Sequence, residues 1–258
     1  MGAGNVIALK KTFDSFKHIV DEFVYGDMLL FPEDRDVLYS YKDEYNLKIL
    51  GLPFDFIFNN GFSKTLNTIA NEASNDLVIY LNTSEVIDID YGMKDIINNN
   101  PDCNAFYFTH ATEIFRWFRC YDRRDLRWAG LIHEELQGEY KPYHKPIFQM
   151  KDEEKDMNNA FKAAVFNSHK ECVYWNQLIK IADNPDNYPE TNDGWKQFAK
   201  DTYQSMKDRL IEKGDMYKKL CAGNYSDYMN AVHLFPFQNI EFKSSDAIAF
   251  QGDKIHLL

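Results

Sequence analysis

The 258-residue sequence is poor in cysteine and has no cysteines at metal-binding or redox spacing. Its four cysteines, Cys103, Cys120, Cys172 and Cys221, are far apart, and no two form a Cys-x-x-Cys pair. Structural zinc sites and disulfide-rich secreted domains need regularly spaced cysteines, so this distribution argues against both. It is typical of a reducing compartment, and we expect a cytoplasmic protein.

The sequence also lacks a long hydrophobic run and an excess of positive charge. No apolar run approaches the roughly 18 residues that a membrane-spanning helix needs, and there is no signal-peptide core. The formal net charge is -11, so no overall basic field attracts nucleic-acid phosphates or an anionic membrane. We therefore expect no membrane span, and DNA is not favoured as a partner.

Up to about Met150, short apolar runs alternate with helical patterns. This alternation predicts an α/β domain with a mostly parallel sheet. With 45% hydrophobic residues, the chain can bury a full core. The expected strands are residues 5–9, 27–31, 47–52 and 75–81, the expected helices are residues 12–24 and 63–73, and residues 105–118 predict antiparallel strands.

After Met150 the pattern becomes helical. Residues 153–182 contain neither Gly nor Pro and predict a long helix. Residues 195–223 predict one or two helices, with a break near Gly214. The two predicted domains are residues 1–150 and a mainly helical region with a short terminal strand or tail, residues 151–258.

The segment RWAGLIHEELQ, residues 127–137, places the ionisable pair His133-Glu134 directly after an apolar run. A zinc-protease helix needs His-Glu-x-x-His, so that two imidazoles share one face. The fourth position after His133 is Gln137, so the metalloprotease interpretation fails. A hydrogen-bonded histidine at a strand end remains an alternative for His133, and we expect Glu135 to be solvated.

A polar cluster follows the buried strand predicted for residues 75–81. It consists of Asn82, Thr83, Ser84 and Glu85. Ligands of open α/β sheets bind at the carboxyl ends of strands, so the cluster is a candidate site, with a plain turn as the alternative. Shortly after it, Asp90 precedes a helical pattern and predicts a helix N-cap.

Two segments resemble family 2-type glycosyltransferases of the GT-A fold. The upstream motif is LVIYLNTSE (residues 77–85), and the downstream motif is IFRWF...RWAGLIHEEL (residues 114–136). They are similar to a branch in which a strand ends in Asp-x-Asp-Glu and FR...RW.G.(V/I)HE.L follows. The helix that contains Asn67 also resembles a family segment. The resemblance covers roughly residues 5–150 and implies a GT-A, Rossmann-like domain followed by an α-helical C-terminal region.

The resemblance implies a transferase that moves a hexosyl or pentosyl group, with inversion, from a nucleotide-sugar donor to a hydroxyl acceptor such as a glycan. Glu134 would be the general base, and a homo-oligomer is compatible with the helical region. The implied donor-binding residues are Asp34, Asn82, Ser84, Glu85 and Arg116, and the implied acceptor-side residues are Trp128 and His133. A solvated turn is an equal alternative for Asp34, and a place in the core is an equal alternative for Trp128. For Arg123 and Arg124, pairing with Asp122 and Asp125 in a surface loop is the favoured role.

The upstream motif departs from the family at the metal position. Asn82 and Ser84 replace both aspartates, and Glu85 alone keeps a charge. The family implies Mn²⁺ or Mg²⁺, for which Glu85 and His133 are the candidate ligands, because Asn and Ser oxygens bind such ions only weakly. Three explanations stay open: a cation held by these two residues, an enzyme that needs no tightly bound metal, or an inactive binding or scaffold protein. A viral or bacterial enzyme that glycosylates a modified nucleobase or a protein side chain is a subsidiary alternative.

Overall fold

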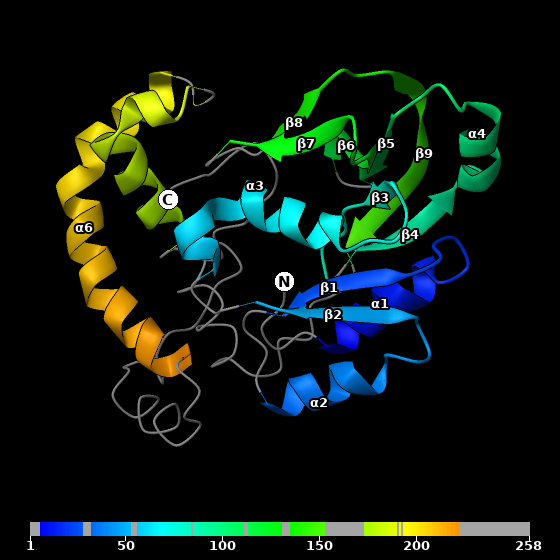
Figure 1. Ribbon diagram of the computed structural model, residues 1–258, viewed down its shortest axis with the longest axis horizontal. Coiled ribbons are helices and arrows are strands. Elements are labelled where there is room, and N and C mark those ends of the chain that lie inside the picture. The colour runs from blue at the N-terminus through cyan, green and yellow to red at the C-terminus, as the bar shows by residue number, and fades with distance from the viewer. Residues whose placement is uncertain are drawn as a thin grey trace. The chain divides into compact units, whose positions relative to one another are not determined.

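The structure is a computed structural model of the whole chain, shown in Figure 1. It describes residues 6–27, 32–52, 56–83, 85–110, 113–130, 135–152, 173–189, 191 and 193–221. The chain divides into two compact units. Unit 1 comprises Met1–Leu52, Thr65–Trp128 and Leu136–Asn158, and unit 2 comprises Pro53–Lys64, Ala129–Glu135 and Asn159–Leu258. The prediction of two sequential domains, residues 1–150 and 151–258, stays a prediction.

Helices and strands alternate through the first part of the chain. The helices are α1 (Val6–Phe16), α2 (Pro32–Ser40), α3 (Phe56–Asn71) and α4 (Met93–Asn99). The strands are β1 (Phe23–Asp27), β2 (Leu47–Gly51), β3 (Leu77–Ile79), β4 (Glu85–Asp90), β5 (Ala105–His110), β6 (Glu113–Asp122), β7 (Leu126–Ala129), β8 (Glu135–Gly138) and β9 (Pro142–Asp152). This composition confirms the predicted α/β class.

The main sheet is mixed, not mostly parallel. Its strand order is β3-β6-β5-β9-β4, and β5–β9 is its one parallel pair among the described residues, the other three pairs being antiparallel (Figure 1). A second parallel pair, β1–β2, forms a separate two-stranded sheet, and β7 and β8 form a third. The prediction of a mostly parallel sheet is therefore wrong. For β5–β6 a short connection is the cause: two residues separate the strands, whereas a parallel crossover needs a dozen or more. The other two antiparallel pairs, β3–β6 and β4–β9, join strands that are distant in the sequence.

Residues 6–9, predicted as part of a strand over residues 5–9, belong to the helix α1, and residue 5 lies outside the described residues. Leu9, Phe13 and Phe16 are all buried, and their spacing of three to four residues puts them on one helical face. The Phe13 ring lies 4.6 Å from that of Phe23, and Phe16 packs edge-on against Phe148 at 5.7 Å. The predicted helix over residues 12–24 is correct only to Phe16, because Phe23 enters the same core from β1.

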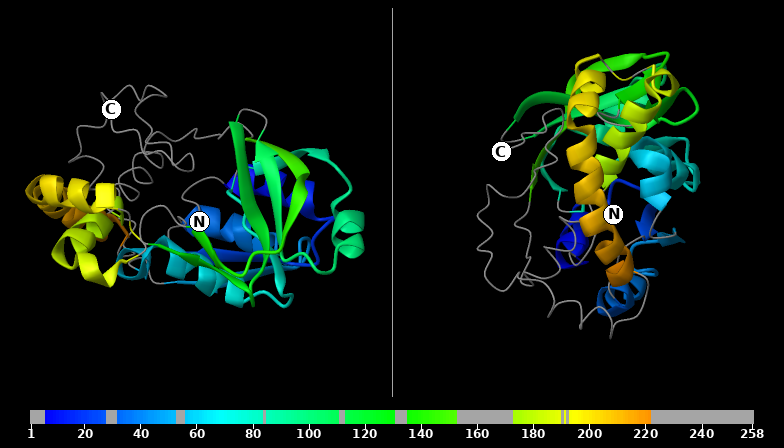
Figure 2. Two further views of the ribbon diagram at one scale, coloured as in Figure 1. Left: turned by 90° about the horizontal axis from the view of Figure 1, so that it is seen from above. Right: turned by 90° about the vertical axis from the view of Figure 1, so that its left-hand side faces the viewer.

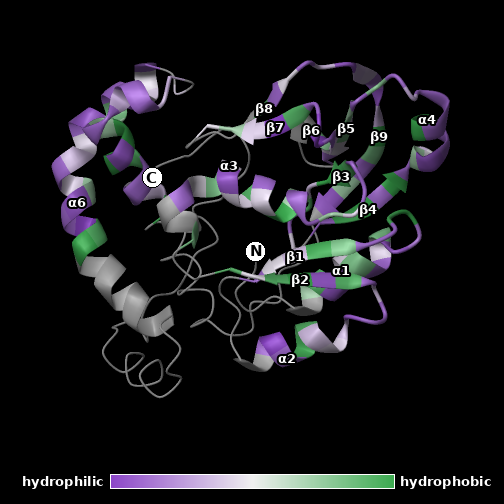
Figure 3. Cartoon of the chain, in the orientation of Figure 1, coloured by the Kyte–Doolittle hydropathy of each residue, from purple (hydrophilic) through white to green (hydrophobic). Residues whose placement is uncertain are grey.

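The other predicted elements of unit 1 agree with the structure where it describes them. β2 and β3 lie within the strands predicted for residues 47–52 and 75–81, and α3 confirms the helix over 63–73 as far as Asn71. β5 and β6 pair antiparallel, as predicted for residues 105–118. Residues 28–31 of the strand predicted at 27–31 lie outside the described residues. Figure 3 shows hydrophobic colours on β1 and β2, and β1 is the more deeply buried of the two strands.

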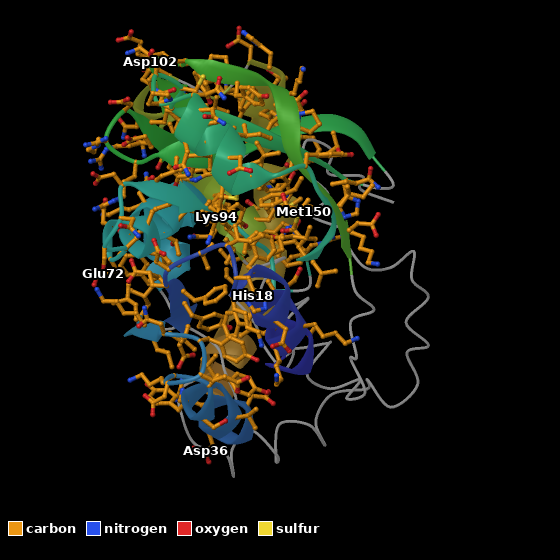
Figure 4. All side chains as sticks on the ribbon, turned by 90° about the vertical axis from the view of Figure 1, so that its right-hand side faces the viewer. His18, Asp36, Glu72, Lys94, Asp102 and Met150 are labelled. Atoms are coloured by element: carbon orange, nitrogen blue, oxygen red, sulfur yellow. The ribbon has the colours of Figure 1, made fainter. Side chains whose placement is uncertain are left out.

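The interior of unit 1 is rich in aromatic side chains. Figure 4 shows them as sticks, with Asp36 and Asp102 at the periphery, where both are exposed. The labelled Met150 is completely buried, in one cluster with Phe106, Phe108 and others. This core holds the main sheet against α1 and positions the strand ends discussed below.

The described residues from Val173 on, which belong to unit 2, are mainly helical, as predicted. Residues 153–172 of the predicted long helix and the predicted terminal strand or tail beyond Cys221 lie outside the described residues. Residues 173–183 are helical, η1 (Pro185–Asn187) is a short 3-10 helix, and α6 spans Asp193–Cys221. The unit has its own core, which includes Trp175, Leu178 and Met206. Figure 2 shows α6 as one helix, so the predicted break near Gly214 is wrong. No helix among the described residues of either unit combines the length and apolarity needed to cross a bilayer.

Candidate functional site

Asn67 on α3 fixes the position of the downstream motif. Its amide nitrogen donates to the backbone carbonyl of Trp128 at 2.8 Å, and the backbone N–H of Trp128 donates to the Asn67 Oδ1 at 3.0 Å. The two residues are 61 positions apart in the chain. Through these two bonds the side chain of Asn67 acts as a strand partner would, and it holds Trp128 in one register.

The indole of Trp128 connects the downstream motif with the upstream motif. Its ring meets that of Tyr80 edge-on at 5.6 Å, and its Nε1 donates to the Tyr121 hydroxyl at 3.0 Å. Such edge-to-face contacts orient aromatic side chains in a favourable geometry. The Tyr80 hydroxyl in turn donates to the Oδ1 of Asn82 at 3.2 Å. Trp128 is half-buried, so it has both a packing role and an exposed part.

Glu85, the charged residue of the upstream motif, is buried and fully hydrogen-bonded. The Asn82 backbone N–H donates to its Oε2 at 2.7 Å, and the Asn82 side-chain amide donates to its Oε1 at 2.8 Å. Arg119 Nη1 donates to both carboxylate oxygens, at 2.8 and 2.9 Å. An ionised carboxylate offers about four acceptor positions, and these four contacts occupy them.

Arg119 lies in a closed, largely apolar environment. The side chains of Arg119 and Glu85 are each 5% exposed. The guanidinium group also lies 5.2 Å from the ring centre of Tyr80 and 5.7 Å from that of Phe108, within the range of cation–π attraction. Sequence reasoning missed Arg119, since an arginine inside an apolar strand shows its role only when its buried acidic partner is known.

The described residues do not fit a divalent cation at Glu85. The acceptor positions of its carboxylate are already used, and a positive group is in direct contact with it. Nowhere in the described ranges do three or more His, Cys, Asp or Glu gather closely enough to hold a metal ion. The metal roles of Glu85 and His133 remain predictions from the sequence resemblance, and His133 itself lies outside the described residues.

The structure places the remaining predicted residues unevenly. Asp34 lies on α2 in unit 1 and is buried, at 8% exposure, and its donor role stays a prediction. Arg116 belongs to β6, the strand that also contains Arg119. Ser84, His133 and Glu134 lie outside the described residues. The structure thus brings Asn82, Glu85 and Trp128 together and leaves the proton-transfer residues to the sequence motif.

A second acidic residue at a strand end was not predicted. Asp27 ends β1 in the parallel β1–β2 pair and is 4% exposed. Arg35 on α2 donates to it through Nε at 2.7 Å. A carboxylate that ends a buried strand is the sequence signal that would have identified it, because strand ends of this kind are frequent ligand sites.

The predicted pairing is confirmed for Arg124 and wrong for Arg123, and Asp90 binds the start of α4 from two positions before the N-cap residue. Arg124 pairs with Asp122 at 2.5 Å on the surface, as expected, whereas Arg123 pairs with Asp76 at 3.4 Å and not with Asp125. The Oδ1 of Asp90 accepts bonds from the backbone N–H groups that begin α4, at 2.8 and 3.0 Å. Asp90 therefore caps this helix, although the N-cap position itself is occupied by glycine.

The thiol of Cys120, next to Arg119 on β6, is expected to make the free energy of unfolding depend on pH in the alkaline range. Burial raises its pKa from 9.0 to about 12. A group with a raised folded-state pKa contributes stability that is complete below its unfolded pKa and is lost as pH rises toward the folded pKa. We expect the free energy of unfolding to fall by about 1.4 kcal/mol per pH unit from this group between pH 9 and 12.

Urea unfolding at a series of pH values would measure this effect, with Cys120→Ala as the comparison. The variant should lose less stability per pH unit because it lacks the thiol. The buried tyrosines, whose pKa values are also raised, titrate in both proteins and contribute equally to the two slopes. Identical slopes for the two proteins above pH 9 would contradict the expectation.

Among solved structures, the chain is similar to S. aureus TarS at 10% sequence identity and a TM-score of 0.41. The match covers 70% of this chain and 42% of that chain, so this chain spans less than half the length of TarS. No protein-family model and no curated protein matches the sequence. A similarity this distant carries no functional conclusion, and the function is inferred from the site itself.

Proposed function

We propose that the protein is a GT-A-type glycosyltransferase that transfers a hexosyl or pentosyl group from a nucleotide sugar to a hydroxyl acceptor. One observation carries the proposal: the two motifs that resemble the family lie in direct contact. Trp128 of the downstream motif packs against Tyr80 of the upstream motif, and the Asn67 side chain binds the backbone of Trp128. Contact between the two motifs is what a shared site requires.

The proposed chemistry is a displacement with inversion. The carboxylate of Glu134 removes the proton of the acceptor hydroxyl while the acceptor oxygen forms its bond to the anomeric carbon. The bond from that carbon to the donor phosphate breaks at the same time, and a nucleoside diphosphate leaves. General-base catalysis of this kind contributes about 10²- to 10⁴-fold in rate.

The donor would lie against the upstream motif. Asn82 and Ser84 would contact the sugar or diphosphate, Arg116 would pair with the departing phosphate through its planar guanidinium, and Asp34 would accept from the base. His133 would contact the diphosphate, and the exposed part of Trp128 would line the acceptor side. Glu85 acts from behind this surface, since it is buried. A glycan is the favoured acceptor; the net charge of -11 disfavours DNA.

A thermal-unfolding screen tests the donor site. The protein would be heated with each of a panel of nucleoside diphosphates and nucleotide sugars. A ligand present at about 100 times its dissociation constant stabilises the folded state by about 2.7 kcal/mol, which is a readily measured increase in Tm. We expect one nucleotide class to raise Tm, and the sugar-bearing form to raise it further. No increase with any member of the panel would remove the proposal.

The second candidate is a catalytically inactive protein that keeps the fold for binding or as a scaffold. It is favoured by the replacement of both metal aspartates and by the closed Glu85–Arg119 pair. This candidate predicts nucleotide-sugar binding without release of nucleoside diphosphate. Donor turnover by the purified protein, abolished in Glu134→Gln, would exclude it.

A further inference from the structure

We propose that Arg119 occupies the electrostatic place of the divalent cation in this chain and that the site binds its donor without a metal ion. Donor binding without a metal ion rests on the proposed function, whereas the absence of a metal ion at Glu85 is inferred from Glu85, Arg119 and Asn82 themselves. Three features of the described site support the inference. They are the hydrogen bonds that the Glu85 carboxylate already accepts, the burial of the Arg119 side chain and the donor and acceptor groups of Asn82.

The carboxylate of Glu85 has no acceptor position left for a cation. Each of its oxygens accepts one bond from Asn82 and one from Arg119, at distances of 2.7 to 2.9 Å. Mn²⁺ and Mg²⁺ bind through carboxylate lone pairs. A metal ion at Glu85 would therefore have to displace Arg119, Asn82 or both.

Arg119 is held in place by more than its partner. Its side chain is 5% exposed and lies over the rings of Tyr80 and Phe108. The guanidinium cannot reach water without opening this packing. A divalent cation beside Glu85 would meet a fixed positive charge, and both charges would compete for one carboxylate.

Asn82 has the functional groups that an internal ion pair needs and a metal site does not. Its amide NH₂ donates to Glu85, and its Oδ1 accepts from Tyr80. An aspartate at this position would place a second carboxylate against Glu85 and offer no donor to it. The exchange of the family aspartate for Asn82 and the presence of Arg119 therefore fit one arrangement, in which the positive charge is built into the protein.

Electron paramagnetic resonance of Mn²⁺ tests the metal part of the inference, because free Mn²⁺ gives a signal that is lost on binding. The full chain would be titrated with Mn²⁺ as the wild type, as Arg119→Met and as the double variant Arg119→Met/Glu85→Gln. We expect no stoichiometric binding by the wild type, binding at least about tenfold tighter in Arg119→Met, and loss of this gain in the double variant. Gain of metal binding on removal of an arginine is a result that a merely structural role would not produce.

Stoichiometric Mn²⁺ binding by the wild type that disappears in Glu85→Gln would overturn the inference. This comparison of the wild type with Glu85→Gln uses no variant that lacks Arg119. It therefore tests whether Glu85 binds Mn²⁺ even if Arg119→Met fails to fold. Circular dichroism of each variant would establish that it is folded before titration.

Titration of nucleoside diphosphates in EDTA and in Mn²⁺ separates the inference from the proposed function. Equal affinity in the two conditions supports both. Binding that requires Mn²⁺ overturns the inference and leaves the proposed function standing. Absence of nucleotide binding in both conditions defeats the proposed function, and the Mn²⁺ titration still decides the metal question.

Discussion

Replacing Arg119 with methionine is expected to cost about 3–5 kcal/mol of folding stability. The variant leaves the carboxylate of Glu85 buried at 4% exposure with only the donors of Asn82. Removing one partner of a buried ion pair destabilises the fold by more than the intact pair stabilises it, because the remaining charge stays out of water. Loss of the cation–π contacts with Tyr80 and Phe108 adds to the effect. Urea unfolding at neutral pH measures the difference.

The double variant Arg119→Met/Glu85→Gln shows whether the uncompensated charge is the cause. It removes both charges and keeps similar side-chain volumes, so most of the lost stability should return. Arg124→Met is the matched surface control. Arg124 pairs with Asp122 but is 66% exposed, and a surface pair of this kind contributes about 0–1 kcal/mol. Equal losses in Arg119→Met and Arg124→Met would show that the Glu85–Arg119 pair is not buried in solution.

Glu134→Gln is expected to lower the rate of sugar transfer by about 10²- to 10⁴-fold while donor binding and Tm stay unchanged. The amide keeps the shape of the side chain but cannot accept the acceptor proton at neutral pH. The measurement is release of nucleoside diphosphate in the presence of an active acceptor, together with the dissociation constant of the donor. A loss in rate without a loss in affinity is the pattern of a catalytic base.

Glu135→Gln is the control for this substitution, because it makes the same chemical change at the neighbouring position. It should retain the wild-type rate. If Glu135→Gln were inactive and Glu134→Gln active, the motif register would be wrong by one residue. If both variants kept the full rate, neither carboxylate would be the base.

The sequence predicted the fold well where periodicity had one interpretation. The apolar strand around Leu77–Ile79, which is half-buried, and the helix through Asn71 were found because apolar runs and helical spacing are distinct there. The apolar residues of 5–9 fit a strand as well as a helix, and only the burial of Leu9 together with Phe13 and Phe16 decides. Strand direction in the main sheet depends on which distant strand pairs with which, and no local pattern contains that information.

The sequence predicted which residues lie together at the site better than it predicted what those residues bind. The resemblance identified Asn82, Glu85 and Trp128, which the structure brings together. It assigned a metal role to Glu85 because the family places one there, and it gave no weight to Arg119, 34 positions further along the chain. That partnership is tertiary, and an isolated arginine in a strand carries no signal of it.

The central claim is that the upstream and downstream motifs form one donor site, and hydrogen exchange tests it most directly. Amide exchange of the wild type would be followed by mass spectrometry with and without the nucleotide sugar that raises Tm most. We predict slower exchange with the ligand in peptides covering residues 80–85 and, together with them, in peptides covering residues 126–134. Protection confined to other parts of the chain, or to only one of the two segments, would contradict a shared site.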